Sequence, residues 1–113
     1  MATATTTLTQ MDEEIWKQIV ESDKPYEVSN LGRVRNARTG KILTPRLTTT
    51  GYHRVHISTP QGRTDFYIHR LVAEAFCEHP DGCDIVNHRD NNPANNKASN
   101  LEWITQKQNV EYA

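Results

Sequence analysis

Residues 86–103 read VNHRDNNPANNKASNLEW and surround one histidine, His88, with an unusual number of asparagines. The six asparagines are Asn87, Asn91, Asn92, Asn95, Asn96 and Asn100. A neutral imidazole can take up a proton near pH 7, and amide oxygens suit a hard divalent cation. Asparagine is also a poor former of helix interiors and strands. The stretch could therefore be a solvated loop, a turn-rich scaffold or the frame of an active site.

The elements around this stretch are predicted to be two short strands followed by a helix. DIVNH (84–88) and NLEWIT (100–105) are short extended segments, and TQKQNVEYA is helical. Thr105 and Gln108 have the spacing of a capping box, which starts the helix at Thr105. Together with the segments upstream, this pattern predicts an α+β fold.

This order of elements places three polar residues at informative points. His88 closes the first strand, Asn100 opens the second, and Asn109 lies one turn into the helix. A helix packed across a two-stranded hairpin brings the end of the first strand close to its own first turn. His88 and Asn109 can then meet, with Asn87 beside them. Between the strands, asparagine side chains can bond their own backbone two residues on, which predicts a compact Ω-type loop.

The residues upstream of the hairpin predict a small antiparallel sheet and one helix. In residues 26–69, turn residues separate extended pieces, and YHRVHIS (52–58) alternates between polar and apolar side chains. This alternation places Val55 and Ile57 on the buried face. HRLVAEAF (69–76) changes to a helical period. EEIWKQIVESD (13–23) fits one helical face but is short and acidic, so its structure stays open.

The net charge of −1 conceals a strongly basic middle third. Residues 30–64 carry seven arginines and lysines and no acid, whereas each flanking segment has an excess of four acids. This asymmetry favours a polyanionic partner, and arginine binds phosphate through two parallel hydrogen bonds. The polar face of the sheet is therefore predicted to bind nucleic acid. The candidate DNA-binding residues are Arg33, Arg35, Arg38, Lys41, Arg46, Tyr52, Arg54, His56 and Arg63.

Composition excludes several other classes of protein. No apolar run approaches the roughly 20 residues of a membrane helix, so no membrane partner is expected. Residues 1–10 lack the basic start and apolar centre of a signal peptide, and residues 1–12 are predicted to be a disordered tail. Cys77 and Cys83 flank His79 in CEHPDGC, but their spacing is not that of a zinc knuckle. A zinc-stabilised interaction domain is a minor alternative.

Three segments, taken in order, resemble the HNH nucleases that contain a ββα-metal motif. NHRDNNPANN…NLEWITQKQN is similar to the His-Asn-Asn form of that motif in homing endonucleases encoded by phages and introns. WKQI…YEVSNLGRVRN resembles the DNA-binding NUMOD segment that precedes HNH motifs in the same branch. IHRLVAEAFC resembles the helix that joins the two, so the resemblance extends over residues 14 to 112.

The resemblance implies a division of the chain and an activity. Residues 13–68 would be a NUMOD-like, DNA-binding sheet, 69–83 a linking helix and loop, and 84–113 the HNH ββα-metal nuclease motif. The implied activity is metal-dependent endonucleolytic hydrolysis of double-stranded DNA. The implied enzyme is a monomer or a homodimer in the cytoplasm of a bacterium or of a phage-infected host cell.

The same resemblance implies roles for individual residues. His88 is the implied general base, since it can take a proton from the attacking water. Asn100 is the implied residue that orients this histidine and pins the loop. Asn87 and Asn109 are the implied ligands of one divalent cation, for which Mg²⁺ or Mn²⁺ is more suitable than Zn²⁺.

One position departs from the family pattern. The residue before the catalytic histidine is commonly aspartate in the family, whereas this chain has the neutral Asn87. Asp90 is a further candidate for supplying negative charge to the metal. His69 could contact DNA, support the site or serve the structure alone. The alternative to an active nuclease is a catalytically weak or inactive DNA-binding module of the same fold.

Overall fold

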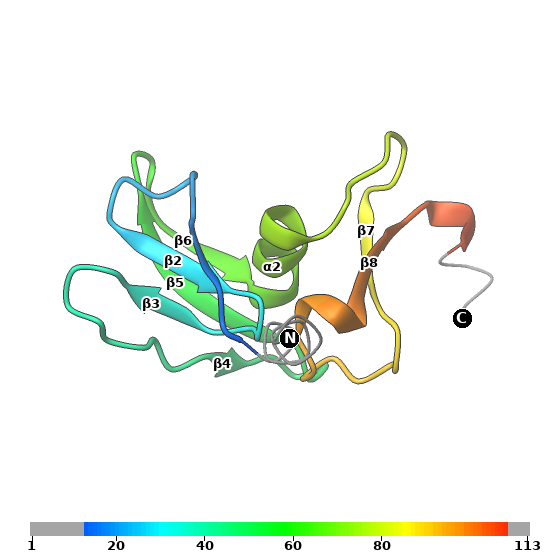
Figure 1. Ribbon diagram of the computed structural model, residues 1–113, viewed down its shortest axis with the longest axis horizontal. Coiled ribbons are helices and arrows are strands. Elements are labelled where there is room, and N and C mark those ends of the chain that lie inside the picture. The colour runs from blue at the N-terminus through cyan, green and yellow to red at the C-terminus, as the bar shows by residue number, and fades with distance from the viewer. Residues whose placement is uncertain (1–12, 109–113) are drawn as a thin grey trace, which may run out of the picture.

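The computed structural model describes residues 13–108. These residues form two three-stranded antiparallel sheets, an α-helix over residues 68–76, a two-stranded hairpin and the start of a C-terminal helix (Figure 1), which confirms the α+β prediction. The predicted N-terminal tail, Asn109 and the end of the predicted C-terminal helix lie outside the described residues.

The first sheet contains β1 (Trp16–Gln18), β2 (Tyr26–Ser29) and β3 (Val34–Asn36) in that order. Residues 16–18 form a strand because they pair with β2, and this pairing decides the structure that the residue pattern left open. Its burial does not follow a helical face, since Ile19 is buried whereas Val20 is 85% exposed. One of the turns expected in residues 26–69 is formed by SNLG, residues 29–32, between β2 and β3.

The second sheet contains β4 (Arg46–Leu47), β5 (His53–Thr59) and β6 (Gly62–Tyr67). The prediction of one sheet over residues 26–69 was therefore wrong. An isolated bridge between Arg35 and Ile42 is followed by Pro45, which has no N–H to continue a ladder, and the chain then starts a new sheet. The predicted alternation in β5 is confirmed, because Val55 and Ile57 are 2% and 0% exposed.

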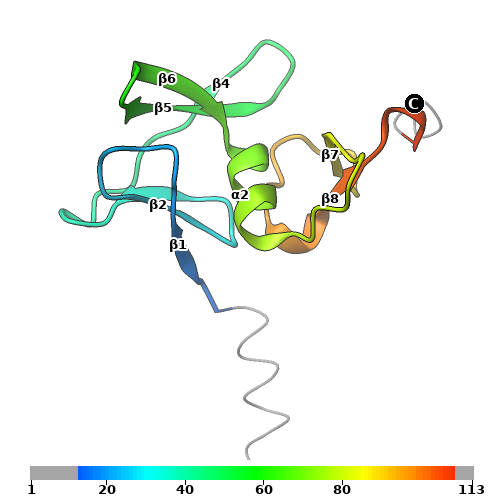
Figure 2. The same cartoon turned by 90° about the horizontal axis from the view of Figure 1, so that it is seen from above.

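Helix α2 (Ile68–Phe76) lies between the sheets and the hairpin, as Figure 2 shows. It carries fully buried side chains, among them Ile68, Val72 and Ala73, into the core that all these elements share. The indole N–H of Trp103 donates a hydrogen bond to the carbonyl of Ala73, 3.2 Å away, and so attaches the hairpin to the helix. No helix among residues 13–108 is long and apolar enough to cross a membrane.

The C-terminal hairpin pairs β7 (Ile85–His88) with β8 (Leu101–Ile104). A 3₁₀ turn, Ala98–Asn100, ends the long loop between the two strands. Beyond β8, the backbone N–H of Thr105 donates to the side chain of Gln108 at 2.9 Å, and the N–H of Gln108 donates back to the Thr105 hydroxyl at 3.1 Å. The predicted capping box is thus confirmed.

Candidate active site

The side chain of His88 is buried at the end of β7, with 6% of its surface exposed. Its Nε2 lies 2.9 Å from the amide Oδ1 of Asn96, which is itself 5% exposed. Because an amide oxygen can only accept a hydrogen bond, this contact places a proton on Nε2 of His88. The other ring nitrogen, Nδ1, is then unprotonated in the neutral imidazole.

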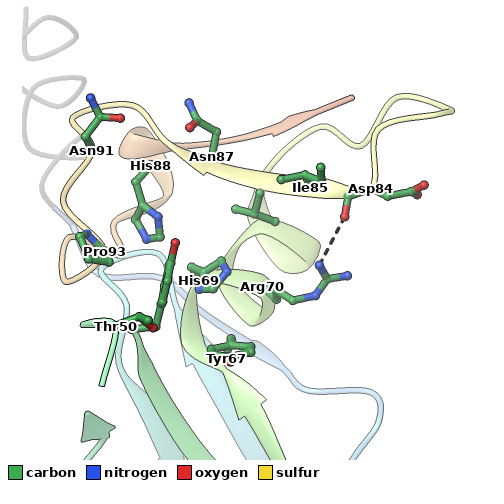
Figure 3. A pocket seen from close by; sticks show the side chains of 12 residues that line it. Thr50, Tyr67, His69, Arg70, Asp84, Ile85, Asn87, His88, Asn91 and Pro93 are labelled. Carbon is green, nitrogen blue, oxygen red and sulfur yellow. Dashed lines mark hydrogen bonds between the residues drawn. The ribbon is translucent and has the colours of Figure 1, made fainter. Parts of the chain in front are cut away.

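His88 faces a cleft of about 480 Å³ between the second sheet, the start of α2 and β7. Figure 3 shows His88 and His69 pointing toward each other across this cleft, whereas the side chain of Asn87, which also lines the cleft, is turned to the other side of β7. The ring centres of His69 and His88 are 5.0 Å apart, and that of Tyr52 is 5.9 Å from His88. Tyr52, a predicted DNA-binding residue, thus lies beside the histidine in this cleft.

His69, in the first turn of α2, is held largely away from water. Burial lowers its pKa from 6.5 to about 4, and the neighbouring charges of His88 and Arg70 act in the same direction. Its Nδ1 atom is buried without a hydrogen-bond partner among the described residues. His69 is therefore a neutral side chain at physiological pH, close to the face of the candidate base.

The lowered pKa of His69 predicts a loss of stability in acid. The unfolded chain takes up this proton near pH 6.5 and the folded chain only near pH 4, so the free energy of unfolding falls as the pH drops through this window. With a discount for the partly exposed ring, the loss is about 1–2 kcal/mol. Urea unfolding at pH 7.5 and pH 4.5 measures it. The difference in the free energy of unfolding between the two pH values should be smaller in the His69→Gln variant and unchanged in a His53→Gln variant. An equal difference in both variants would contradict the assignment to His69.

Asn87 lies directly across the hairpin from Glu102, on the other face of β7 from His88. Its amide Nδ2 donates to Oε2 of Glu102 at 3.0 Å. The second carboxylate oxygen of Glu102 is 3.6 Å from the guanidinium of Arg89. Position 87 has no carboxylate of its own, but the carboxylate of Glu102 lies beside it. Glu102 was not among the predicted site residues. The register of an antiparallel hairpin would have pointed to it.

Asp90 and Asn100 organise the loop rather than the histidine. The carboxylate of Asp90 accepts hydrogen bonds from the side chains of Asn95 and Asn100 and from the N–H of Asn92, and these bonds hold its pKa below the usual value. Asn100 Oδ1 accepts the N–H of Asp90, and the carbonyl of Asn100 accepts the N–H of Arg89.

These contacts modify the prediction for Asn100. The side chain of Asn100 pins the loop, but the side chain that accepts a hydrogen bond directly from His88 is that of Asn96. Asn100 acts on His88 only through the backbone pairing of the adjacent residue, Arg89. Nothing in the sequence separates Asn96 from the other asparagines, because its contact depends on the path of the loop. Asn91 adopts a left-handed conformation, φ 61°, as asparagines in such loops readily do.

The basic residues are divided between the two sheets and are partly neutralised. Arg33 forms an ion pair with Glu14, and Arg35 forms one with Glu27 at 2.8 Å. The guanidinium carbon of Arg35 also lies 4.0 Å from the centre of the Trp16 ring. On the second sheet, Arg54 and His56 both contact Asp65, and Arg46 contacts His56. Within residues 13–108, ion pairs are absent at Arg38, Lys41 and Arg63.

The cysteines do not assemble a zinc centre. The ring of His79 stacks on Trp103, 3.7 Å between centres, and its Nε2 contacts the carbonyl of Cys83 at 2.5 Å. The thiol of Cys77 lies 3.6 Å from the carbonyl of Leu101. No group of three His, Cys, Asp or Glu side chains in the described part of the chain could hold a metal ion.

Comparison with known protein families gives two matches that follow one another along the chain. The model of the NUMOD4 motif matches residues 14–58. The model of the HNH endonuclease family matches residues 66–111. The first match contains the first sheet, β4 and nearly all of β5, and the second contains His88 and the asparagine-rich loop.

Individual relatives agree with these matches. DNA endonuclease I-HmuI of Bacillus phage SP01 is 42% identical over 96 residues, which are 85% of this chain and 55% of the relative. An uncharacterized HNH endonuclease, L245, of Acanthamoeba polyphaga mimivirus is 41% identical over 98 residues, 87% of this chain and 29% of the relative. This chain thus spans about half of one relative and less than a third of the other.

A solved structure of "DNA binding and cleavage by the HNH homing endonuclease I-HmuI" has the same fold. It superposes with a TM-score of 0.77 at 41% identity, over 87% of this chain and 56% of that chain. The two family matches, the identity to relatives and the shared fold lead to one conclusion. This chain belongs to the HNH endonuclease family and carries a NUMOD4 motif ahead of its HNH segment.

Proposed function

We propose that this protein is a metal-dependent endonuclease that hydrolyses a phosphodiester bond of double-stranded DNA. The observation that carries the proposal is the buried His88, which is held through Nε2 by Asn96 and faces an open cleft. A histidine oriented through one ring nitrogen presents the other to a substrate in a single protonation state.

His88 is the general base of the proposed reaction. The Nε2–H group of His88 donates a hydrogen bond to Asn96. The lone pair on Nδ1 can then take a proton from a water that attacks the phosphorus atom. The phosphate would lie in the cleft, close to the neutral His69 and to Tyr52, whose hydroxyl can donate to a phosphate oxygen. His69 remains uncharged at neutral pH and so does not oppose protonation of His88.

The residues near Asn87 fit a hard divalent cation. Glu102 accepts a hydrogen bond from the Asn87 Nδ2, which leaves the amide oxygen as a ligand and places a carboxylate beside it. Asn109, which lies outside the described residues, is the proposed second ligand. Asn87 also lines the cleft, and a bound Mg²⁺ or Mn²⁺ would neutralise charge on the phosphate and on the departing oxygen. The carboxylate of Asp90 is engaged within the loop, so we assign it to loop structure.

Both sheets contribute to the proposed DNA interface. Arg38, Lys41 and Arg63 are assigned to the first phosphate contacts, because the described residues leave them without ion pairs. Arg33, Arg35, Arg46, Arg54 and His56 would exchange an acidic or histidine partner for phosphate. DNA binding and cleavage by I-HmuI, a relative of the same fold, supports this assignment.

The proposed division follows the predicted boundaries. Residues 13–68 would bind DNA, residues 69–83 would connect the two parts, and residues 84–113 would form the nuclease motif that cleaves DNA. The active protein would be a monomer or a homodimer. A specific observation favours a second function, a DNA-binding module of the same fold that does not cut. The residue before His88 is the neutral Asn87, so the metal site depends on neighbours for its negative charge.

The two functions are separated by incubating the protein with supercoiled plasmid in Mg²⁺, in Mn²⁺ or in EDTA. The nuclease is expected to convert plasmid to open circles or linear DNA with either cation and to leave it intact in EDTA. A gel-shift assay in EDTA should show binding that weakens with salt, because phosphate contacts release counterions. Shifted DNA that is never cut with either cation would favour the binding module.

A further inference from the structure

We propose that two glycine turns of the DNA-binding sheets position the catalytic histidine by holding the asparagine-rich loop on both sides. The turns are those of Gly32, between β2 and β3, and of Gly51, between β4 and β5. This inference rests on the proposed nuclease function and assigns it two positioning residues that are remote from His88 in sequence.

The first turn contacts the residue that holds the histidine. A Cβ on Gly32 would lie 3.0 Å from both the Cβ and the carbonyl oxygen of Asn96. Such contacts are tighter than almost all contacts of real Cβ atoms, so a side chain at position 32 requires Asn96 to shift by a few tenths of an ångström. Asn96 is 5% exposed, and its Oδ1 holds His88 at 2.9 Å. Gly32 is therefore connected to His88 through one buried residue, Asn96.

The turn around Gly32 is itself tied down. The fully buried Ser29 accepts hydrogen bonds at its hydroxyl from the N–H groups of Leu31 and Arg33. The carbonyl of Asn30 accepts the N–H of Ala98, 2.8 Å away, which joins the turn to the far end of the loop. Because the turn cannot retreat without breaking these bonds, a bulkier residue at position 32 must displace Asn96.

The second turn holds the opposite side of the loop. A Cβ on Gly51 would lie 3.2 Å from Cγ of Pro93, and the next residue, Tyr52, stands beside His88. The loop itself contains no regular structure between β7 and the 3₁₀ turn, so its path depends on such external contacts. Both sheets thereby contact the loop that holds His88, one at Asn96 and the other at Pro93.

Gly32→Ala and Gly40→Ala form a matched pair that tests the proposal. Both glycines have positive φ, +89° and +76°, so alanine strains both backbones alike, by about 1 kcal/mol. A Cβ on Gly40 would have no neighbour within 4 Å. Gly32→Ala is expected to lower kcat for plasmid nicking about 10- to 100-fold with unchanged KM and DNA affinity. Gly40→Ala should stay near wild type. An equal loss in both variants would overturn the proposal.

A second readout does not depend on cutting. Nitrogen-15 NMR of the His88 ring reports which nitrogen carries the proton, and the signal is assigned with a His88→Gln variant. We expect a single Nε2–H form in wild type and in Gly40→Ala, and a mixture of both forms in Gly32→Ala. An unchanged His88 signal in Gly32→Ala would overturn the positioning role. If the wild-type protein did not cleave DNA, the proposed nuclease function would be overturned. The NMR measurement would still test whether Gly32 positions His88, because it does not require cleavage.

Gly51→Ala and Gly62→Ala repeat the comparison at the second turn. They cover the case in which Gly32→Ala does not fold. Both positions have positive φ, +91° and +109°, and a Cβ on Gly62 has open space. Gly51→Ala is expected to lower kcat about threefold to tenfold, since its Cβ contact is looser. A loss in Gly62→Ala as large as in Gly51→Ala would contradict the proposal.

Discussion

Replacing His88 with alanine is expected to reduce metal-dependent nicking of plasmid DNA about 10²- to 10⁴-fold, the usual contribution of a general base. DNA affinity measured in EDTA should stay close to that of wild type, because His88 is buried and the basic side chains lie on the sheet strands and their connections. The measurement is the initial rate of conversion to open circles under saturating Mg²⁺. Cutting by His88→Ala at the wild-type rate would refute the assignment of the base.

Two further variants separate catalysis from folding. Alanine at position 88 leaves the buried amide of Asn96 without a partner, which costs about 1–3 kcal/mol. His88→Gln restores an N–H donor for Asn96 but offers no basic nitrogen, so it should be more stable than His88→Ala and just as inactive. His53→Ala removes a histidine of β5 that does not line the cleft, and it should cut normally.

Replacing Asn87 with aspartate is expected to lower the Mg²⁺ or Mn²⁺ concentration needed for half-maximal cutting by about tenfold. The new carboxylate would lie across the hairpin from Glu102, so like charges would repel and destabilise the metal-free protein. A cation bound between them removes this repulsion. The variant should therefore show a lower melting temperature without metal and a larger rise in melting temperature on addition of Mn²⁺.

Asn92→Asp is the matched control for this change. It adds the same charge in the loop that follows β7, where the Asn92 side chain accepts the N–H of Ala94 and does not face Glu102 across the hairpin. Its response to metal should equal that of wild type. Asn87→Ala should raise the metal requirement about 10- to 100-fold. A metal response that is the same in Asn87→Asp and Asn92→Asp would show that overall charge, and not ligation at position 87, is responsible.

Much of the local structure follows from residue order alone. The alternation in β5 predicted that Val55 and Ile57 point inward, because side chains of a strand alternate between its faces. The capping box at Thr105 is likewise a contact between near neighbours. The break between two sheets was missed, since the same run of short strands can pair in one sheet or in two. Only long-range packing against α2 distinguishes these arrangements.

The charge pattern likewise separates what residue order predicts from what long-range folding decides. Counting charges along the chain predicted a strongly basic middle third, residues 30–64, without an acid. In the folded protein, however, Glu14, Glu27 and Asp65 pair with several of its bases. Two of these acids come from segments that precede the basic third of the sequence, and one follows it. A linear charge count has no information on which segments fold against each other.

Residue types and their spacing were enough to identify the family and the kind of side chain at the site. The positions of His88, Asn100 and the capped helix specify a strand–loop–strand–helix unit, and each of these signals acts over a few residues. Which of the six asparagines holds His88 depends instead on long-range contacts, because in an irregular loop no periodicity links a residue to its neighbours in space. Asn96 reaches the histidine because the turns of Gly32 and Gly51, far away in the chain, direct the path of the loop.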